Sequence, residues 1–220
     1  PLTKADKAAN EIICKGLTTL FPDIPIISEE NRQVSYNVRS KYEYFWLVDP
    51  LDGTKEFIKK NGEFTVNIAL VKGSKVVGGI VYTPVTDEMY HAYSEKGAYL
   101  LKDGHTSKLG ANVFAMNDSN LGVVCSRSHL NEATTKFVEQ LDEPHMVSKG
   151  SSLKFLILAS GEAELYPRLA PTMEWDTAAA QIILEEAGGS VIDNETGESL
   201  QYNKQVLRNP YFVAYANLQE

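Results

Sequence analysis

The sequence predicts an α+β first half built on an antiparallel sheet and an α/β second half with a mostly parallel or mixed sheet. In the first half, β-rich apolar runs follow one another without intervening helices, which is typical of antiparallel strands. In the second half, short apolar strands alternate with helical segments. A tract rich in Gly, Asn, Asp and Ser separates the two halves. We therefore expect an N-terminal domain at 1–120 and a C-terminal domain at 121–220.

The first half is expected to open with an amphipathic helix over 4–20, capped by Thr3, because apolar residues recur there at helical spacing. A short strand over 24–27 follows, and the polar segment 31–41 is predicted to be a surface loop. The apolar run 44–48 predicts a buried strand. The remaining strands of this half are expected in two hairpins, at 64–71 with 75–82 and at 88–93 with 97–102.

The second half is expected to alternate between the two kinds of element. Its strands are predicted at 121–125, 146–148, 163–166, 190–192 and 211–214. Its helices are predicted at 132–141, 151–159 and 176–187. The last helix is rich in alanine, and the pair Gly188-Gly189 is a typical helix end.

Composition excludes several classes of function. A chain of 220 residues that is 43% hydrophobic and 23% charged can bury a core. Its net charge of −8 argues against binding to nucleic-acid polymers. No run reaches the roughly 18 apolar residues of a membrane span. The distant Cys14 and Cys125 indicate reduced thiols and a cytoplasmic protein, with peripheral attachment to the inner membrane left open. The chain starts at Pro1 without a methionine, and the sequence leaves open whether residues precede it.

Carboxylates gather at three places in the sequence. Asp49 and Asp52 follow the predicted strand 44–48, with the Leu51 carbonyl between them. Glu29 lies at the end of another strand, and Asp176 precedes an apolar helix. Oxygen ligands of this kind suit hard divalent cations such as Mg²⁺. Two structural interpretations stay open, since Asp-Gly is also a hairpin signal and an aspartate before a helix is also a natural N-cap.

Two motifs resemble the signatures of the inositol monophosphatase superfamily, the Mg²⁺-dependent and Li⁺-sensitive phosphomonoesterases. They are Asp49-Pro-Leu-Asp-Gly-Thr54 and Trp175-Asp-Thr-Ala-Ala179, with Ser28-Glu-Glu30 upstream. Other segments resemble the bacterial CysQ type of 3′(2′),5′-bisphosphate nucleotidases; they include Asn61-Gly-Glu-Phe-Thr-Val-Asn67, Ser126-Arg-Ser-His129, Gly150-Ser-Ser-Leu-Lys-Phe155 and Tyr166-Pro-Arg168. The resemblance implies a layered αβαβα sandwich of the inositol monophosphatase/fructose-1,6-bisphosphatase type, with its site between two sheets.

The resemblance also implies the metal-binding and catalytic residues. Two or three Mg²⁺ ions would be held by Glu29, Asp49, the Leu51 carbonyl, Asp52 and Asp176, most of which lie in the N-terminal domain. Water activated by these ions would attack phosphorus. Thr54 would position that water, and Asp6 would accept the proton of the Thr54 hydroxyl. The implied catalytic set is therefore Thr54, Asp6, Glu29 and Asp49.

The substrate implied by the resemblance is adenosine 3′,5′-bisphosphate, hydrolysed to AMP and phosphate in sulfur assimilation and nucleotide recycling. The amides of Gly53 and Thr54 would hold the scissile phosphate. The other phosphate or the sugar would be held by a second set of residues, namely His129, Ser151, Lys154 and Arg168, and Asp176 would also contact substrate. Lys154 and Arg168 are alternatively plain solvated charges. Two other functions remain open: a phosphatase acting on inositol or sugar phosphates, and a non-catalytic sensor of nucleotide or phosphate.

Overall fold

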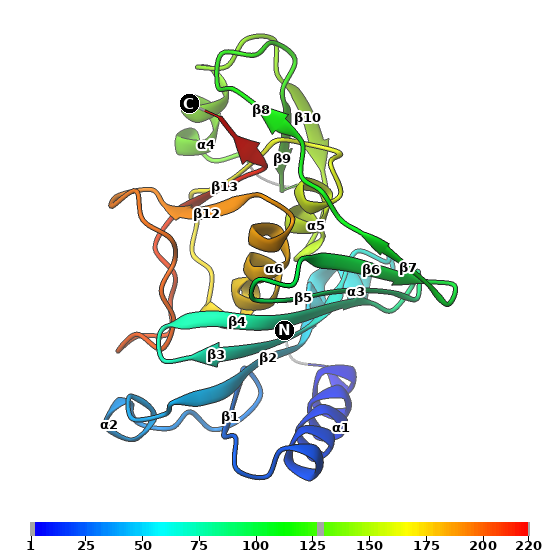
Figure 1. Ribbon diagram of the computed structural model, residues 1–220, viewed down its shortest axis with the longest axis vertical. Helices are drawn as coiled ribbons and strands as arrows, with labels where there is room; N and C mark the ends of the chain where they lie inside the picture. The colour runs from blue at the N-terminus through cyan, green and yellow to red at the C-terminus, as the bar shows by residue number, and fades with distance from the viewer. Residues whose placement is uncertain (1–2, 127–129, 220) are drawn as a thin grey trace.

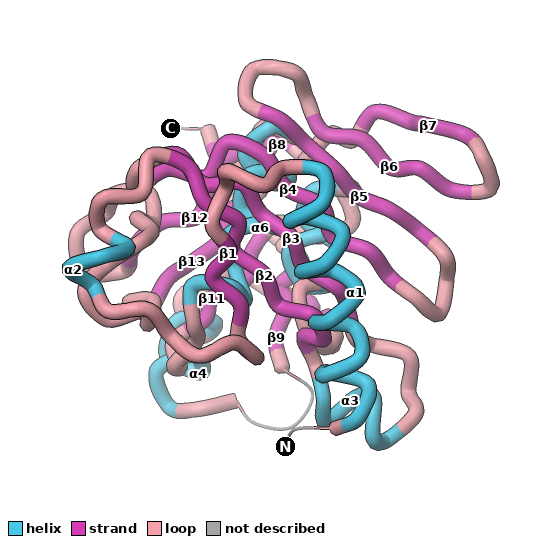
Figure 2. The backbone as a smooth tube through the Cα atoms, turned by 90° about the horizontal axis from the view of Figure 1, so that it is seen from below, coloured by secondary structure: helices cyan, strands magenta, loops and turns pink. Residues whose placement is uncertain are grey.

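The computed structural model describes residues 3–126 and 130–219. Five layers are stacked in it: helix α1 (Lys4–Leu20), a seven-stranded sheet, helices α5 (Leu153–Ala159) and α6 (Glu174–Glu186), a five-stranded sheet, and helix α4 (Glu132–Val138) (Figure 1). Figure 2 shows α1 lying across the first sheet beside β2 (Tyr44–Asp52). The expected αβαβα order is confirmed.

The first sheet follows the chain from one edge to the other. Its strands lie in sequence order, β1 (Ile26–Ser28), β2, β3 (Thr65–Lys72), β4 (Lys75–Thr83), β5 (Glu88–Tyr93), β6 (Ala98–Lys102) and β7 (His105–Lys108). All neighbouring pairs are antiparallel except β1 and β2, which run parallel. The long connection 29–43 carries the chain back before β2 begins, so this one pair departs from the expected antiparallel pattern.

The second sheet is mixed, as expected. Its order is β10 (His145–Ser148), β9 (Gly122–Cys125), β11 (Leu165–Arg168), β13 (Phe212–Tyr215) and β12 (Ser190–Asp193). The pairs β10–β9 and β9–β11 are parallel, whereas β11–β13 and β13–β12 are antiparallel. Two short strands, β8 (Val113–Phe114) and β14 (Asn217–Leu218), form a separate pair. The division into domains at residue 120 stays a prediction.

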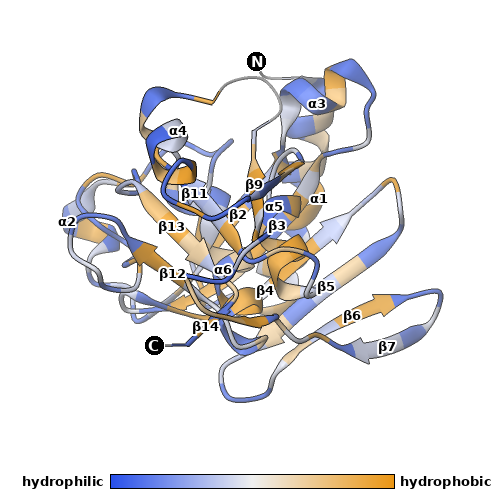
Figure 3. Ribbon diagram, turned by 90° about the horizontal axis from the view of Figure 1, so that it is seen from above, coloured by the Kyte–Doolittle hydropathy of each residue, from blue (hydrophilic) through white to orange (hydrophobic). Residues whose placement is uncertain are grey.

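The two middle helices are the apolar centre of the molecule. Figure 3 shows hydrophobic segments gathered in strands of both sheets and in the helices between them. Helix α6 lies so close to β4 that a side chain on Gly79 would have its Cβ 2.6 Å from the carbonyl oxygen of Ala179. Glycine and alanine at this crossing therefore let a helix that follows β11 pack directly on the first sheet. This packing carries the start of α6 to the end of β2.

Several elements differ in their bounds from the prediction, and two of these differences have a structural explanation. The predicted loop 31–41 contains a short helix, α2 (Tyr36–Arg39). Its Arg39 is buried and donates hydrogen bonds of 2.7 Å to Asn203 Oδ1 and to the carbonyls of Lys204 and Gln205. Helix α5 begins later than predicted, at Leu153, because the backbone two residues earlier is left-handed. Local sequence patterns predict neither the short helix α2 nor the left-handed residue before α5.

No helix among the described residues combines the length and the apolar character that a membrane crossing requires.

Candidate active site

The candidate site begins at an irregularity in strand β2. In a regular strand, side chains three residues apart point to opposite faces, so Asp49 and Asp52 would be separated. The pairing shifts between them, because Asp49 faces Asn67 whereas Asp52 faces Thr65, only two residues away on β3. The extra residue of this β-bulge returns both carboxylates to one side. The sequence predicted a strand end at Val48 followed by a turn, but β2 continues through both carboxylates.

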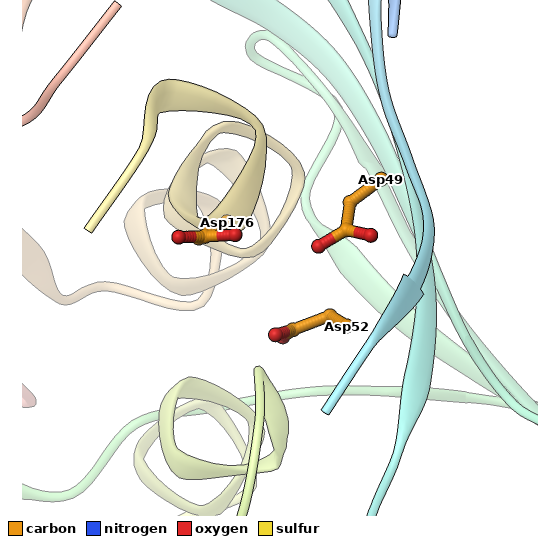
Figure 4. A group of neighbouring side chains, drawn as sticks. All are labelled: Asp49, Asp52 and Asp176. Atoms are coloured by element: carbon orange, nitrogen blue, oxygen red, sulfur yellow. The ribbon is translucent and has the colours of Figure 1, made fainter. Parts of the chain in front are cut away.

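Three carboxylates meet between β2 and α6. Asp49 and Asp52 come from the strand and Asp176 from the first turn of the helix, and their side chains point toward one another (Figure 4). One oxygen from each lies within 4.8 Å of the others. Asp49 is buried, and the other two are half-buried. Three negative charges at this spacing repel one another unless protons or cations neutralise them.

Burial raises the pKa of all three carboxyls. The pKa of Asp176 rises to about 7, first because burial disfavours the charged form and next because Asp52 is nearby. The same two causes raise the pKa of Asp49 well above its usual range. Burial also raises the pKa of Asp52, although hydrogen bonds from Ser152 and the charge of Lys154 oppose that change. Without cations, the cluster therefore retains protons that isolated carboxyls would have released.

We expect the metal-free protein to lose stability as pH rises from 3.8, the ordinary pKa of the aspartyl side chain, to about 7. In this range the folded protein keeps the Asp176 proton and the unfolded chain releases it, so the free energy of unfolding decreases. Thermal unfolding in EDTA across the range measures this slope. Asp176→Asn should flatten it, and a slope unchanged by that substitution would contradict the prediction.

Asp52 is held in place by hydrogen bonds from two other elements. Its Oδ2 accepts from the backbone N–H of Ser152 at 2.7 Å and from the Ser152 hydroxyl at 2.8 Å. The Asn67 amide donates to Ser152 Oγ at 2.8 Å, and Thr65 donates to the Asn67 carbonyl oxygen at 2.9 Å. Sequence reasoning missed these roles. The alternation of Thr65 and Asn67 on one strand face was the signal that could have found two of them.

Asp6 and Thr54 meet as the sequence predicts. The Thr54 hydroxyl, at the start of α3 (Thr54–Lys59), donates to Asp6 Oδ1 at 3.2 Å and lies 3.4 Å from the Leu51 carbonyl oxygen. The other oxygen of Asp6 accepts the Thr3 backbone N–H at 2.7 Å and also the Thr3 hydroxyl. The expected capping box of α1 is therefore present. It fixes the orientation of the carboxylate that Thr54 reaches.

Gly53 allows the chain to pass from β2 into α3. Its φ of +92° lies in the left-handed region, where a side chain is strained. An added Cβ would also lie 3.1 Å from the Glu63 carbonyl oxygen and 3.1 Å from Ser151 Cβ. The glycine of the Asp-Gly pair thus brings Thr54 and Ser151 to the same small space.

Glu29 lies beside the cluster and is not one of its three closest members. It follows β1, and its backbone N–H donates to the Val48 carbonyl at 3.1 Å, which places it next to Asp49. Partial burial and the charges of Glu30, Asp52 and Asp6 raise the pKa of Glu29, while a hydrogen bond with Asp49 opposes that rise. The side chain as a whole is exposed. Its role as a metal ligand stays a prediction.

The interpretation of Asp176 as the N-cap residue of a helix is wrong, because the helix begins before it. The N-cap of α6 is Met173, and Asp176 is the third helical residue. Asp176 Oδ2 accepts the backbone N–H of Met173 at 2.8 Å, so the carboxylate still serves the start of the helix through one oxygen. This contact orients Asp176 from the α6 side, as Ser152 orients Asp52 from the α5 side.

A polar cavity of about 400 Å³ adjoins the carboxylates. A smaller one of about 80 Å³ continues it toward Asp176. Both are lined by Asp52, Ser151, Lys154 and Arg168. Of the other predicted substrate residues, Gly53 lines the larger cavity and Asp176 the smaller one, Thr54 lines neither, and His129 lies outside the described residues. An apolar hollow of about 540 Å³ on the first sheet has no carboxylate in its wall, so donor chemistry, not size, locates the site.

Lys154 and Arg168 give this cavity positive charge that suits an anionic ligand. Lys154 is only 7% exposed, with its ammonium 5.5 Å from the centroid of the Tyr166 ring, so the plain solvated-charge interpretation is wrong for it. Burial lowers the pKa of Lys154 and Asp52 opposes this. Arg168 Nε and Ser151 Oγ are buried without a partner among the described residues. Ser151 also has a left-handed φ of +43°, a strained backbone of the kind found at binding sites.

The donor set fits hard divalent cations. The nearest side-chain donors are carboxylate oxygens from three acids, and the Leu51 carbonyl lies close by. Such ions prefer oxygen, and their charge would remove the repulsion that raises the pKa of these acids. Among the described residues, the thiols Cys14 and Cys125 are not part of the group.

The chain is similar to proteins of one family throughout its length. The model of the inositol monophosphatase family matches residues 1–219. The 3′(2′),5′-bisphosphate nucleotidase CysQ of Salmonella typhimurium is 47% identical over 96% of this chain and 84% of its own length. The same enzyme of Escherichia coli K12 is 45% identical, with the same two coverages. The crystal structure of CysQ from Bacteroides thetaiotaomicron, 39% identical, superposes with a TM-score of 0.85 over 98% of this chain and 84% of its own.

Proposed function

The chain belongs to the inositol monophosphatase family, and on that premise we propose that it hydrolyses adenosine 3′,5′-bisphosphate to AMP and phosphate, with Mg²⁺ as the cofactor. The observation that carries the proposal is the meeting of Asp49, Asp52 and Asp176 beside a cavity that also holds Lys154 and Arg168. Anionic donors and cationic side chains that line one cavity suit a metal-bound ligand with two phosphates. A cytoplasmic location is part of the same proposal.

Different residues of the chain are assigned to metal binding, water orientation and phosphate binding at the scissile phosphate. Two or three divalent ions, when bound by Glu29 and the three aspartates, would supply charge neutralisation of the phosphate and a lower pKa for attacking water. The Thr54 hydroxyl donates its hydrogen bond to Asp6, so its oxygen is left to accept a hydrogen bond from that water. Because Thr3 fixes Asp6, this direction of donation is set before substrate binds. The Gly53 and Thr54 amides are assigned to the phosphate oxygens.

The other phosphate is assigned to the cationic side chains of the cavity. Ser151 Oγ and Arg168 Nε are buried polar atoms whose partners would come from the ligand. Lys154 adds a charge that burial makes effective, since a low local dielectric strengthens electrostatic attraction. A phosphate there would give each of these groups a charge-assisted hydrogen bond. His129 is assigned to the same phosphate or to the sugar on the basis of its motif.

Release of inorganic phosphate from adenosine 3′,5′-bisphosphate tests the proposal. We expect turnover with Mg²⁺, loss of turnover to background with excess EDTA, and recovery when Mg²⁺ is restored, because the carboxylates alone would repel an anionic substrate. Added Li⁺ and Ca²⁺ should inhibit. Turnover that persists in EDTA would contradict a metal-dependent mechanism.

Inositol monophosphate and adenosine 3′-monophosphate are the matched control substrates. A preference for inositol monophosphate would overturn the nucleotidase assignment while leaving the phosphatase in place. Tight binding of the bisphosphate without hydrolysis in Mg²⁺ would instead indicate a sensor. The fully assembled pair Asp6 and Thr54 favours an enzyme, because binding alone does not need an oriented hydroxyl at the carboxylate cluster.

A further inference from the structure

Helix α1 turns a polar face toward the candidate site. Two of its residues are buried, Asp6 and Asn10, and they lie one helical turn apart on the same face. Asp6 reaches Thr54 and belongs to the proposed catalytic set, whereas Asn10 has no part in it. Burying an amide side chain costs free energy unless its polar atoms are paired. The partners of Asn10 therefore indicate what this side chain does.

Asn10 joins α1 to the segment that carries Glu29. Its Nδ2 donates to Asn31 Oδ1 at 2.8 Å, and its Oδ1 accepts from the hydroxyl of Ser28 at 2.6 Å. The thiol of Cys14 makes a weaker contact with the same oxygen at 3.4 Å. Asn10 is 9% exposed and Ser28 is fully buried. One amide thus bonds the residues at both ends of the segment 28–31.

Other restraints on the segment 28–31 act mostly on its backbone, since Gln33 Nε2 donates to the carbonyls of Ser28 at 2.9 Å and of Asn31 at 3.2 Å. The backbone of the segment closes through Asn31 N–H to the Ser28 carbonyl at 3.2 Å and is tied to β2 through Glu29 N–H to Val48 at 3.1 Å. The Glu29 side chain is exposed, so packing does not hold it, and the hydrogen bond with Asp49 is its contact with the cluster. Its direction relative to Asp49 therefore depends on how its two flanking residues are anchored. Ser28 and Asn31 are both anchored on Asn10.

We propose that Asn10 is a positioning residue that holds Glu29 at the Asp49 side of the carboxylate cluster. The inference rests on the proposed function, in which Glu29 is a metal ligand. It predicts a selective effect. Asp52 and Asp176 are held by Ser152 and by the Met173 backbone, so ions bound mainly by these two carboxylates do not depend on Asn10.

Calorimetric titration of the full chain with Mg²⁺, without substrate, tests the inference. Asn10→Ala and Ser28→Ala remove the same hydrogen bond from opposite ends. Each substitution should lower the Mg²⁺ affinity of one class of sites about 10–100-fold, as loss of a group that orients a metal ligand does. The affinity of the remaining class should not change. Lys15→Ala, exposed on the same helix, is the matched control and should bind as the wild type does. Saturating Mg²⁺ should restore kcat toward the wild-type value in both variants.

A double-mutant cycle with Glu29→Gln separates positioning from general damage. Glu29→Gln should lose the same class of Mg²⁺ sites, and adding Asn10→Ala to it should cost nothing further, because the two act as one unit. Wild-type affinity in the Asn10 and Ser28 variants, additive losses in the cycle, or collapse of every ion class would overturn the inference. If the wild type itself bound no Mg²⁺, the proposed function would fail instead, so the two failures are distinguishable.

Discussion

Replacing Asp49 by asparagine is expected to lower kcat about 10²–10⁴-fold, because ions at such a site contribute several kcal/mol to the transition state. Asp49 is 1% exposed and shares the cluster with Asp52 and Asp176. Asparagine keeps the size of the side chain and the oxygen that accepts the Leu51 N–H at 3.1 Å, but it removes the charge. Hydrolysis of adenosine 3′,5′-bisphosphate over a series of Mg²⁺ concentrations measures the loss.

The same substitution should make the metal-free protein more stable, which separates a chemical loss from a folding defect. Burial first, then Asp52 and Asp176, oppose ionisation of Asp49, and asparagine relieves that conflict. The Tm in EDTA above neutral pH should rise, by about 2–4 °C for each kcal/mol relieved. Asp103→Asn, at an exposed turn, is the matched control. Normal turnover in Asp49→Asn would place the chemistry elsewhere in the molecule.

The meeting of Asp49, Asp52 and Asp176 was predictable because two family motifs carry them, although each motif also allowed a purely structural interpretation. The helix over 4–20 and the hairpin of β3 and β4 were also predictable, since their apolar periods and turn residues agree locally. The bulge between Asp49 and Asp52 was not. Its position depends on which β3 residues pair with β2, and no pattern within the motif states that pairing. The turn predicted from the sequence therefore corresponds to this β-bulge in the sheet.

The residues that orient the carboxylates were less predictable than the carboxylates themselves. Ser152 bonds Asp52 across 100 residues of sequence, and Asn10 bonds Ser28 across 18. Neither serine nor asparagine carries a distinctive local signal, because both are common in turns and caps. Lys154 has the same ambiguity, since a lysine in a short helix is usually solvated, whereas here tertiary packing buries it, with its ammonium near the Tyr166 ring. Tertiary contacts decide these roles.

Replacing Arg168 by alanine is expected to impair bisphosphate hydrolysis far more than monophosphate hydrolysis. Arg168 lines both polar cavities and its Nε is buried without a described partner. Its Nη2 makes a long contact of 3.4 Å to the Pro171 carbonyl. A charge-assisted hydrogen bond contributes about 1.5–3 kcal/mol, so kcat/KM for adenosine 3′,5′-bisphosphate should fall about 10–100-fold. For adenosine 3′-monophosphate the change should stay below about fivefold, the effect of a screened charge.

Arg168 tests the second phosphate site better than Lys154 does. The Lys154 ammonium acts on the pKa of Asp52, so Lys154→Met would disturb the metal end and should impair both substrates. Arg168→Ala leaves that charge in place and removes only the distal donor. Lys75→Ala, at the exposed β3–β4 hairpin, removes the same net charge and should affect neither substrate. Equal losses on the two substrates in Arg168→Ala would mean that Arg168 serves the scissile phosphate, and the 5′-phosphate would then need another partner.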